Sequence, residues 1–560
     1  MRREVSVVNK KVCSFPILFA LLALLIGTCA VVFPASAQAA PTSTGSITVS
    51  GNVASSYDTY QIFSANVVDG DSDAKIATDL AWASDATRDA VLPVLHSAGM
   101  PNSQTTAQEA AEWLNTDSHL TSALSARLAR SLQSSGAVSV ALNAGTAAEL
   151  PCGYWLIVAD DDAVAQGEAG TAPIMALVGG RAVTVKPKAA TPKVSKHVLE
   201  DSAAAWQKAA DATVADDLYW RLSATVPAGL AAYDTYTVQF VDTMSAGLDP
   251  SKVAASMRVY AAAGADGGFD AVACESGNAN STPAKGWTDI TSQCKVSVEG
   301  NAFTVRTGDL IAALGGADAF AAGARVVAVY NAPLNSACNH GIAKGNPNEV
   351  YLRYPRSPFA DQSGDAGFTR TPSDDACAYT WDLALTKRGS DGDKPLAGAV
   401  LSIADDRGRT LAADGTWDAE GKATVTTGED GRVTVSGVDS GKLEVRELKA
   451  PKGYTAFEGT RSVTVKAEGL DVDQVAAAKP KLTITAESPL RADSADGSTG
   501  SLEASLINTP TGTPPSITTG GFMPSTGDMA MYAAAAAAVA GAALIVVALL
   551  VKRGGGSHKE

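Results

Sequence analysis

Charged residues are scarce in this sequence, and basic residues are the scarcer kind. Only 18% of the 560 residues are charged, with 44 basic and 59 acidic side chains and a formal net charge of -15. Such an acidic chain repels phosphate backbones, and no Lys/Arg-rich run inside it offers a local exception. We therefore expect no nucleic-acid partner. The 46% hydrophobic content argues against intrinsic disorder.

The sequence also lacks the residue clusters of an enzyme or a metal site. Its five histidines form no motif with a cysteine, and no nucleophile or paired-carboxylate motif is recognisable. The acidic turns at 160–162 and 391–393 do not have the spacing of a calcium loop. We therefore expect no enzymatic activity, no metal site and no cofactor.

Long hydrophobic runs stand out at the two ends of the chain. Near the N-terminus, four basic residues precede the apolar stretch Phe15–Phe33, and small residues of the A-x-A type follow it. This order is typical of a secretory signal peptide, which we assign to residues 1–40. An N-terminal membrane anchor is the alternative.

The run near the C-terminus, Met529–Val551, contains 23 mostly apolar or small residues. As a helix it is long enough to cross a bilayer core of about 30 Å. Lys552 and Arg553 follow at once and place the short tail on the cytoplasmic side. We therefore expect a C-terminal transmembrane helix, with the bulk of the chain outside the cell.

Between these ends, the length suits about three folded units. The first, residues 41–189, shows strand-like alternation at Ser46–Val53 and Tyr57–Ser64. Thr105–Asn115 and Leu120–Leu132 follow helical spacing instead, and strands resume from Val138. We expect a sheet with helical insertions.

The second and third units, residues 190–372 and 373–511, contain many short strand-like stretches separated by Gly, Pro, Asp and Asn. Val253–Ala261 and Ala324–Tyr330 are two of these stretches. Little helical periodicity competes with them, so the pattern predicts β-sandwiches and a mainly β fold class. Residues 512–560 then contain a linker, the transmembrane helix and the basic tail.

Two lysines near the starts of these units are predicted to point into the core. Strand periodicity puts Lys196 on the same face as Val194 and Val198, and Lys387 on the face of the preceding leucines. A lone ammonium group in an apolar core is costly. Each lysine must therefore be paired, neutral or consumed by a reaction.

Each unit offers a carboxyl group and an amide on matching buried faces, namely Asp242 with Asn348, and Glu447 with Asn508. A protonated carboxyl group can polarise the Asn carbonyl while burial lowers the lysine pKa. The amine can then attack and expel ammonia, which leaves an intramolecular isopeptide bond. The alternative is a set of buried salt bridges.

Several motifs carry a family resemblance. The pentapeptide at 523–527, followed by the apolar span and basic tail, resembles the cell-wall sorting signal of Gram-positive surface proteins, although Met523 replaces the usual Leu. The stretches 242–248 and 346–352 resemble the isopeptide-forming domain of fimbrial subunits. Residues 396–399, 447–454 and 507–510 resemble a collagen-adhesin B-type domain. The sorting motif consists of Met523, Pro524, Ser525, Thr526 and Gly527.

Together these likenesses are typical of sortase-assembled backbone pilins with immunoglobulin-like domains. The resemblance implies isopeptide bonds from Lys196 to Asn348, assisted by Asp242, and from Lys387 to Asn508, assisted by Glu447. It implies none in the first unit, where no lysine precedes Lys75 in the opening strands.

The resemblance also implies cleavage by a sortase between Thr526 and Gly527 and transfer of Thr526 to a lysine of the next subunit. Residues 183–188 match the linking motif of such pilins except that Lys186 replaces its aromatic residue. Lys188 is therefore the candidate nucleophile, with Lys186 and Lys193 as rivals.

Five cysteines remain after loss of the signal peptide. Cys274 and Cys294 flank a loop and are the favoured disulfide. Cys152, Cys338 and Cys377 cannot be paired from the sequence, with Cys338 to Cys377 an open alternative.

The expected function is that of a shaft subunit of a covalent cell-surface pilus. The expected partners are a pilus-class sortase, identical subunits, minor pilins and peptidoglycan, with host glycans or matrix proteins left open. The expected location is the cell wall, after secretion and transient membrane anchoring. The alternatives are a monomeric wall-anchored adhesin with a sandwich-domain stalk and, less favoured, a wall-anchored enzyme.

Overall fold

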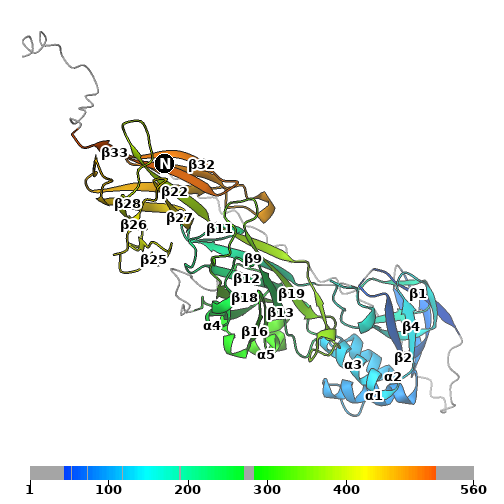
Figure 1. Cartoon of the computed structure of the whole chain (residues 1–560). Helices are drawn as coiled ribbons and strands as arrows, with labels where there is room; N and C mark the ends of the chain where they lie inside the picture. Colours follow the sequence, from blue (N-terminus) through cyan, green and yellow to red (C-terminus); the bar gives the residue numbers. More distant parts are fainter. Residues whose placement is uncertain are drawn as a thin grey trace, which may run out of the picture.

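The computed structural model describes residues 43–512, apart from 52, 72–73, 117, 188–190 and 270–282. Three bodies follow one another along an elongated molecule, with the helix-bearing first body at one end and the last strands at the other (Figure 1). No helix among the described residues is long and apolar enough to cross a membrane. The predicted signal peptide, Lys188, Cys274, the sorting motif and the C-terminal apolar run lie outside the described residues.

The first body is built around the long strand β2 (Ser56–Asp69), which pairs with β6 (Gly153–Ala159) on one side. β3 and β4 share its other side, β7 extends β6, and β1 pairs with β5 and β8 in a separate small sheet. Their bounds are β1 (Thr44–Val49), β3 (Lys75–Trp82), β4 (Ser139–Asn143), β5 (Ala148–Pro151), β7 (Ile174–Val178) and β8 (Val183–Val185).

Three helices insert between β3 and β4 and pack on the sheet through a shared apolar core. α2 (Ala107–Asn115) begins at a capping box formed by Thr106 and Glu109, and α3 (Ser122–Ser135) ends at Gly136, whose φ of 73° suits a glycine. Both helices confirm the predicted helical insertions. α1 (Asp85–Ser97) was not predicted; it contains Pro93, although Ser84 caps its start.

The second body is a sandwich of two sheets that share one core. The first sheet has the order β10-β9-β12-β18-β14-β15 and the second the order β11-β21-β19-β13-β17-β16, with β20 added to β19. The first sheet consists of β9 (Lys193–Glu200), β10 (Ala205–Gln207), β12 (Tyr219–Val226), β14 (Arg258–Ala263), β15 (Thr288–Asp289) and β18 (Ala324–Asn331). The second consists of β11 (Ala209–Asp211), β13 (Gln239–Met244), β16 (Lys295–Glu299), β17 (Ala302–Arg306), β19 (Asn346–Pro355), β20 (Phe368–Arg370) and β21 (Asp374–Tyr379).

Two details of this body differ from the expected pattern. The predicted strand Val253–Ala261 is wrong in its first half, because Val253–Ser256 forms the short helix α4 and β14 begins only at Arg258. Strand β21 lies beyond the predicted boundary at residue 372 and pairs with β19 and β11 of the second body. Two further short helices are α5 (Leu310–Ala313) and α6 (Ala317–Phe320).

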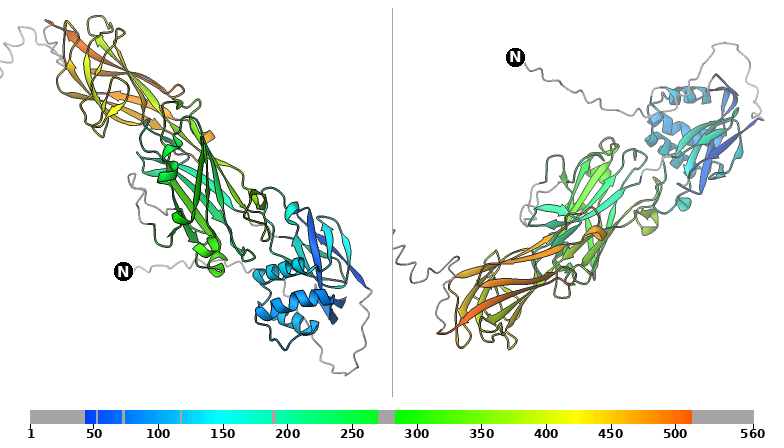
Figure 2. Two further views of the ribbon diagram at one scale, coloured as in Figure 1. Left: turned by 60° about the horizontal axis from the view of Figure 1, so that its bottom comes forward. Right: turned by 90° about the horizontal axis from the view of Figure 1, so that it is seen from above.

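The third body is also a sandwich, and its first and last strands are neighbours (Figure 2). β22 (Trp381–Gly389) and β33 (Ser501–Pro510) pair in parallel, with Lys387 opposite Leu506 and Gly389 opposite Asn508. Their sheet also contains β27 (Arg432–Val438), β29 (Tyr454–Thr455) and β32 (Leu490–Asp496). The facing sheet consists of β23 (Val400–Ala404), β24 (Thr410–Leu411), β25 (Trp417–Asp418), β26 (Val425–Thr426), β28 (Gly441–Lys449), β30 (Thr460–Glu468) and β31 (Lys481–Ala486). The predicted mainly β class of tandem sandwiches is confirmed.

Candidate functional site: two buried lysines

The second body brings Lys196, Asp242 and Asn348 together across its two sheets. Lys196 lies on β9 of the first sheet, whereas Asp242 and Asn348 lie on the paired strands β13 and β19 of the second. The register places Asn348 opposite Met244, one inward position from Asp242. All three residues are 0% exposed, so the site is sealed from solvent.

A tyrosine that the sequence reasoning did not single out stands at the centre of this site. Lys196 Nζ contacts Asp242 Oδ2 and donates a hydrogen bond to the Tyr330 hydroxyl at 2.9 Å. Asn348 Nδ2 donates to the same hydroxyl at 2.8 Å, and that hydroxyl donates to Asp242 Oδ2 at 3.2 Å. The alternation of strand 324–330 puts Tyr330 on the same inward face as Val326 and Ala328. Its hydrogen-bond partners cannot be predicted from this local pattern.

Burial sets the protonation of these groups. It lowers the pKa of Lys196 to about 8, although the neighbouring Asp242 carboxyl opposes the shift. Burial also raises the pKa of Asp242, against the effect of Lys196. The Lys196 ammonium lies 5.6 Å from the Trp220 ring centroid, which offers a weak cation–π contact in place of water. A neutral amine beside a protonated carboxyl group is therefore accessible near neutral pH.

The third body repeats the residue types with a different topology. Lys387 and Asn508 lie on the parallel neighbours β22 and β33, and Glu447 reaches them from β28 in the facing sheet. Lys387 Nζ contacts Asn508 Oδ1 and lies 3.2 Å from Glu447 Oε1. Asn508 Nδ2 donates to Glu447 Oε1 at 2.9 Å and to Oε2 at 3.1 Å. Burial lowers the pKa of Lys387 to about 8.

Side chains hold the backbone of Lys196 in place. Its N–H donates to Asp374 Oδ2 at 2.7 Å, and its carbonyl accepts from Lys208 Nζ at 2.8 Å. Lys208 Nζ also pairs with Asp374 Oδ2, so the two residues form one clamp around the lysine. Asp374 is the first residue of β21 and Lys208 directly precedes β11, the two strands that close this edge of the sandwich.

Backbone groups perform the same task for Lys387. Its N–H donates to Gly431 O at 2.8 Å, and its carbonyl accepts from Leu396 N at 2.8 Å. Gly431 has a φ of 71°, and a Cβ there would lie 2.9 Å from Lys387 O, so only glycine fits this close approach.

The first body contains no counterpart among its described residues. The ammonium group of Lys75 donates to the carbonyls of Gly179 and Arg181 and lies 3.9 Å from Asp69. Neither carbonyl belongs to a side-chain amide, so Lys75 has the contacts of a structural lysine.

The four described cysteines are free thiols, namely Cys152, Cys294, Cys338 and Cys377. Cys338 and Cys377 are therefore not joined, and that open alternative is wrong. Cys294 donates to Ile290 O at 3.3 Å, while its predicted partner Cys274 lies outside the described residues. The Cys274 to Cys294 disulfide stays a prediction.

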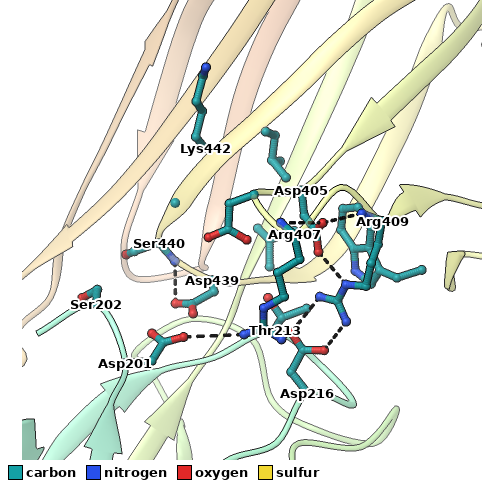
Figure 3. Close-up of a pocket in the computed structure, with 15 residues that line it drawn as sticks. Asp201, Ser202, Thr213, Asp216, Asp405, Arg407, Arg409, Asp439, Ser440 and Lys442 are labelled. Carbon is teal, nitrogen blue, oxygen red and sulfur yellow. Dashed lines mark hydrogen bonds and ion pairs between the residues drawn. The ribbon is translucent and has the colours of Figure 1, made fainter. Parts of the chain in front are cut away.

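A polar pocket lies at the junction of the second and third bodies, where Arg407 and Arg409 pair with acidic side chains (Figure 3). Arg409 binds Asp216 with two hydrogen bonds and Asp405 with a third, and Arg407 also contacts Asp216. No group of three or more His, Cys, Asp or Glu residues in the described part of the chain could hold a metal ion. The ion pairs of Arg407 and Arg409 with Asp216 thus link the two bodies.

A known protein family matches the third body of this chain. Residues 382–479 match the family model described as SpaA, a prealbumin-like fold domain. The trypsin-resistant surface T6 protein of Streptococcus pyogenes serotype M6 is 30% identical over 143 residues, which is 24% of this chain and 24% of that protein. The match therefore spans about a quarter of the length of this curated relative.

Solved structures of pilus subunits are also similar. The T6 backbone pilin of Streptococcus pyogenes shares 17% identity with a TM-score of 0.45, over 84% of this chain and 98% of that one. The major pilin SpaD of Corynebacterium diphtheriae shares 14% identity with a TM-score of 0.41 over the same shares of the two chains. The resemblance to Gram-positive pilus subunits that the motifs predict is confirmed by the domain model and the T6 relative.

Proposed function

We propose that this chain is the structural shaft subunit of a covalent cell-surface pilus. The observation that carries the proposal is the pair of sealed sites in which a lysine, a carboxyl group and an asparagine meet, one in each sandwich. A structural protein that must bear tension gains from bonds that close each domain internally. The T6 and SpaD proteins, which are described as backbone or major pilins, support the same role.

Each site would form one isopeptide bond by the same balanced step. The lysine first passes a proton to the carboxylate, which gives a neutral amine and a carboxylic acid. The amine nitrogen then attacks the asparagine Cγ, a new C–N bond forms, the bond from Cγ to Nδ2 breaks, and ammonia leaves. Lys196 would thus be joined to Asn348, and Lys387 to Asn508.

Polymerisation would join Thr526 of one subunit to Lys188 of the next through a pilus-class sortase. Support for this step comes from the sorting motif, the apolar run and the linking motif at 183–188. β8 ends at Val185, and the rivals Lys186 and Lys193 are both exposed. Minor pilins and peptidoglycan would be further partners, and host glycans or matrix proteins the adhesion targets.

A gel and mass experiment tests the proposal on the native fibre. Wild-type surface fibres should give a covalent ladder on denaturing gels, and each subunit should lack two ammonias relative to its sequence. Lys188→Ala should abolish the ladder, whereas the matched variants Lys186→Ala and Lys193→Ala should keep it. A full ladder from Lys188→Ala would overturn the choice of lysine, and a wild-type chain without any ladder would favour the monomeric adhesin.

A further inference from the structure

Among the described residues of the second body, the Tyr330 hydroxyl contacts all three reacting side chains. It lies 2.9 Å from Lys196 Nζ, 2.8 Å from Asn348 Nδ2 and 3.2 Å from Asp242 Oδ2. Tyr330 is 0% exposed, and its ring is packed edge-on against Phe303 with centroids 4.7 Å apart. The hydroxyl is therefore held at the point where the attacking and departing nitrogens meet.

In the third body a direct contact between the carboxyl group and the amide takes the place of the tyrosine hydroxyl. There both Glu447 oxygens accept directly from the Asn508 amide, so the carboxyl group itself can hand a proton to the leaving nitrogen. In the second body the Asn348 amide donates to Tyr330 instead. Within the described structure, Asp242 Oδ1 and Asn348 Oδ1 are buried without a hydrogen-bond partner. In the second body the Tyr330 hydroxyl thus links the carboxyl group of Asp242 to the amide of Asn348. In the third body Glu447 contacts the amide directly.

We propose that Tyr330 is a catalytic residue of the second site, which relays a proton from the attacking Lys196 amine to the departing Asn348 nitrogen. The inference rests on the proposed isopeptide chemistry and adds a participant that the third site lacks. After Nζ attacks Cγ, the new bond leaves a positive charge on Nζ. Nζ gives one proton to the Tyr330 oxygen while the Tyr330 hydroxyl proton passes to Nδ2, which leaves as ammonia.

This exchange balances without a change in the tyrosine. Tyr330 takes one proton as it gives another, the bond from Cγ to Nδ2 breaks, and Asp242 is free to return its own proton to ammonia. Burial and the Asp242 carboxyl raise the pKa of Tyr330 well above its usual value, so a phenolate intermediate is disfavoured. A concerted relay through a neutral phenol fits that environment.

The test removes only the hydroxyl. Full-length chains carrying Tyr330→Phe are sampled over time after synthesis, and peptide mass mapping follows both crosslinks in the same molecules. General acid–base groups contribute about 100-fold or more, so the Lys196 to Asn348 bond should form about 100-fold more slowly. The Lys387 to Asn508 bond should form at the wild-type rate and acts as an internal reference.

Tyr233→Phe is the matched control, because Tyr233 lies in the same core and its buried hydroxyl has no hydrogen-bond partner in the described structure. That variant should form both bonds normally. If Tyr330→Phe forms the second-body bond at the wild-type rate, the relay is overturned. If the wild-type chain never forms that bond, the proposed chemistry itself fails, which is a distinguishable result.

A second substitution keeps the shape and the hydroxyl. Replacement of Tyr330 by 3-fluorotyrosine makes the phenol more acidic without removing it. A purely structural role of Tyr330 therefore predicts no change in the rate at which the Lys196 to Asn348 bond forms. A relay predicts a changed rate for the Lys196 to Asn348 bond and an unchanged rate for the third-body bond. Equal rates with and without fluorine would overturn the inference even if Tyr330→Phe fails to fold.

Discussion

The two lysine sites use the same residue types on opposite topologies. In the second body the lysine and the asparagine lie on different sheets, and the carboxyl group shares a sheet with the asparagine. In the third body the lysine and the asparagine lie on adjacent strands, and the carboxyl group comes from the facing sheet. The proposed chemistry would thus depend on contact in a sealed core, and either arrangement of strands can supply that contact.

The difference has a mechanical meaning. A bond from Lys387 to Asn508 would run alongside the hydrogen bonds between β22 and β33, so it reinforces a ladder that already joins the first and last strands. A bond from Lys196 to Asn348 would pin two layers together. The joined positions are 152 and 121 residues apart, and on the chain-entropy model such loops are each worth about 5 kcal/mol. The two proposed bonds would therefore differ in the direction of the load that they bear, and hardly in their entropic contribution.

Removal of the carboxyl groups should have the largest effect on bond formation and on the free energy of unfolding. Asp242→Ala and Glu447→Ala should each abolish their own bond and leave the other intact, because the sites lie in separate cores. Each variant also leaves a buried lysine unpaired, which costs about 3–5 kcal/mol. Intact mass gives the number of ammonias lost, and denaturant unfolding gives the free energy. Loss of both bonds in either single variant would contradict the independence of the two sites.

The pH dependence of the unbonded domains should be the next largest effect. In Asn348→Ala and Asn508→Ala each lysine stays an amine, with a pKa of about 8 in the folded chain against 10.5 for an unperturbed lysine. The unfolded chain binds more protons between these values, so the free energy of unfolding should rise with pH across that window by about 3 kcal/mol.

The matched control for this prediction is the wild-type chain, in which the proposed bond would turn each lysine nitrogen into an amide that does not titrate. Its free energy of unfolding should therefore lack the added rise between pH 8 and 10.5. Parallel curves for the variants and the wild-type chain would contradict the lowered lysine pKa.

Removal of the clamp formed by Lys208 and Asp374 around Lys196 should have the smallest effect on the free energy of unfolding. Lys208→Ala removes the charged hydrogen bonds to Lys196 O and Asp374 and should cost the second body about 2 kcal/mol. The third body should be unaffected, because backbone groups hold Lys387. Lys252→Ala is the matched control: Lys252 makes an exposed ion pair with Asp217, which is worth less than about 1 kcal/mol. Equal costs for the two variants in denaturant unfolding would show that the clamp is dispensable.

The sequence predicted which side chains of the candidate sites face the core better than it predicted the complete fold. Period-two alternation was enough to turn Lys196 and Lys387 inward, and the same counting aligned Asp242, Asn348, Glu447 and Asn508 with buried faces. Helix α1 was not predicted because Pro93 interrupts its helical pattern, although Ser84 caps its start. The segment at 253–256 was misjudged because four residues are too few for periodicity to separate a helix turn from a strand.

Composition, the periodicity of apolar residues and the spacing of motifs determined the mainly β class and the inward faces of the two buried lysines and of their carboxyl and amide neighbours. These features are local, since each depends on residues within a few positions of one another. The tertiary structure decided which strands are neighbours, that one site spans two sheets while the other joins adjacent strands, and that Tyr330 completes the first of them. Such facts depend on contacts between residues more than 80 positions apart, which no local pattern encodes.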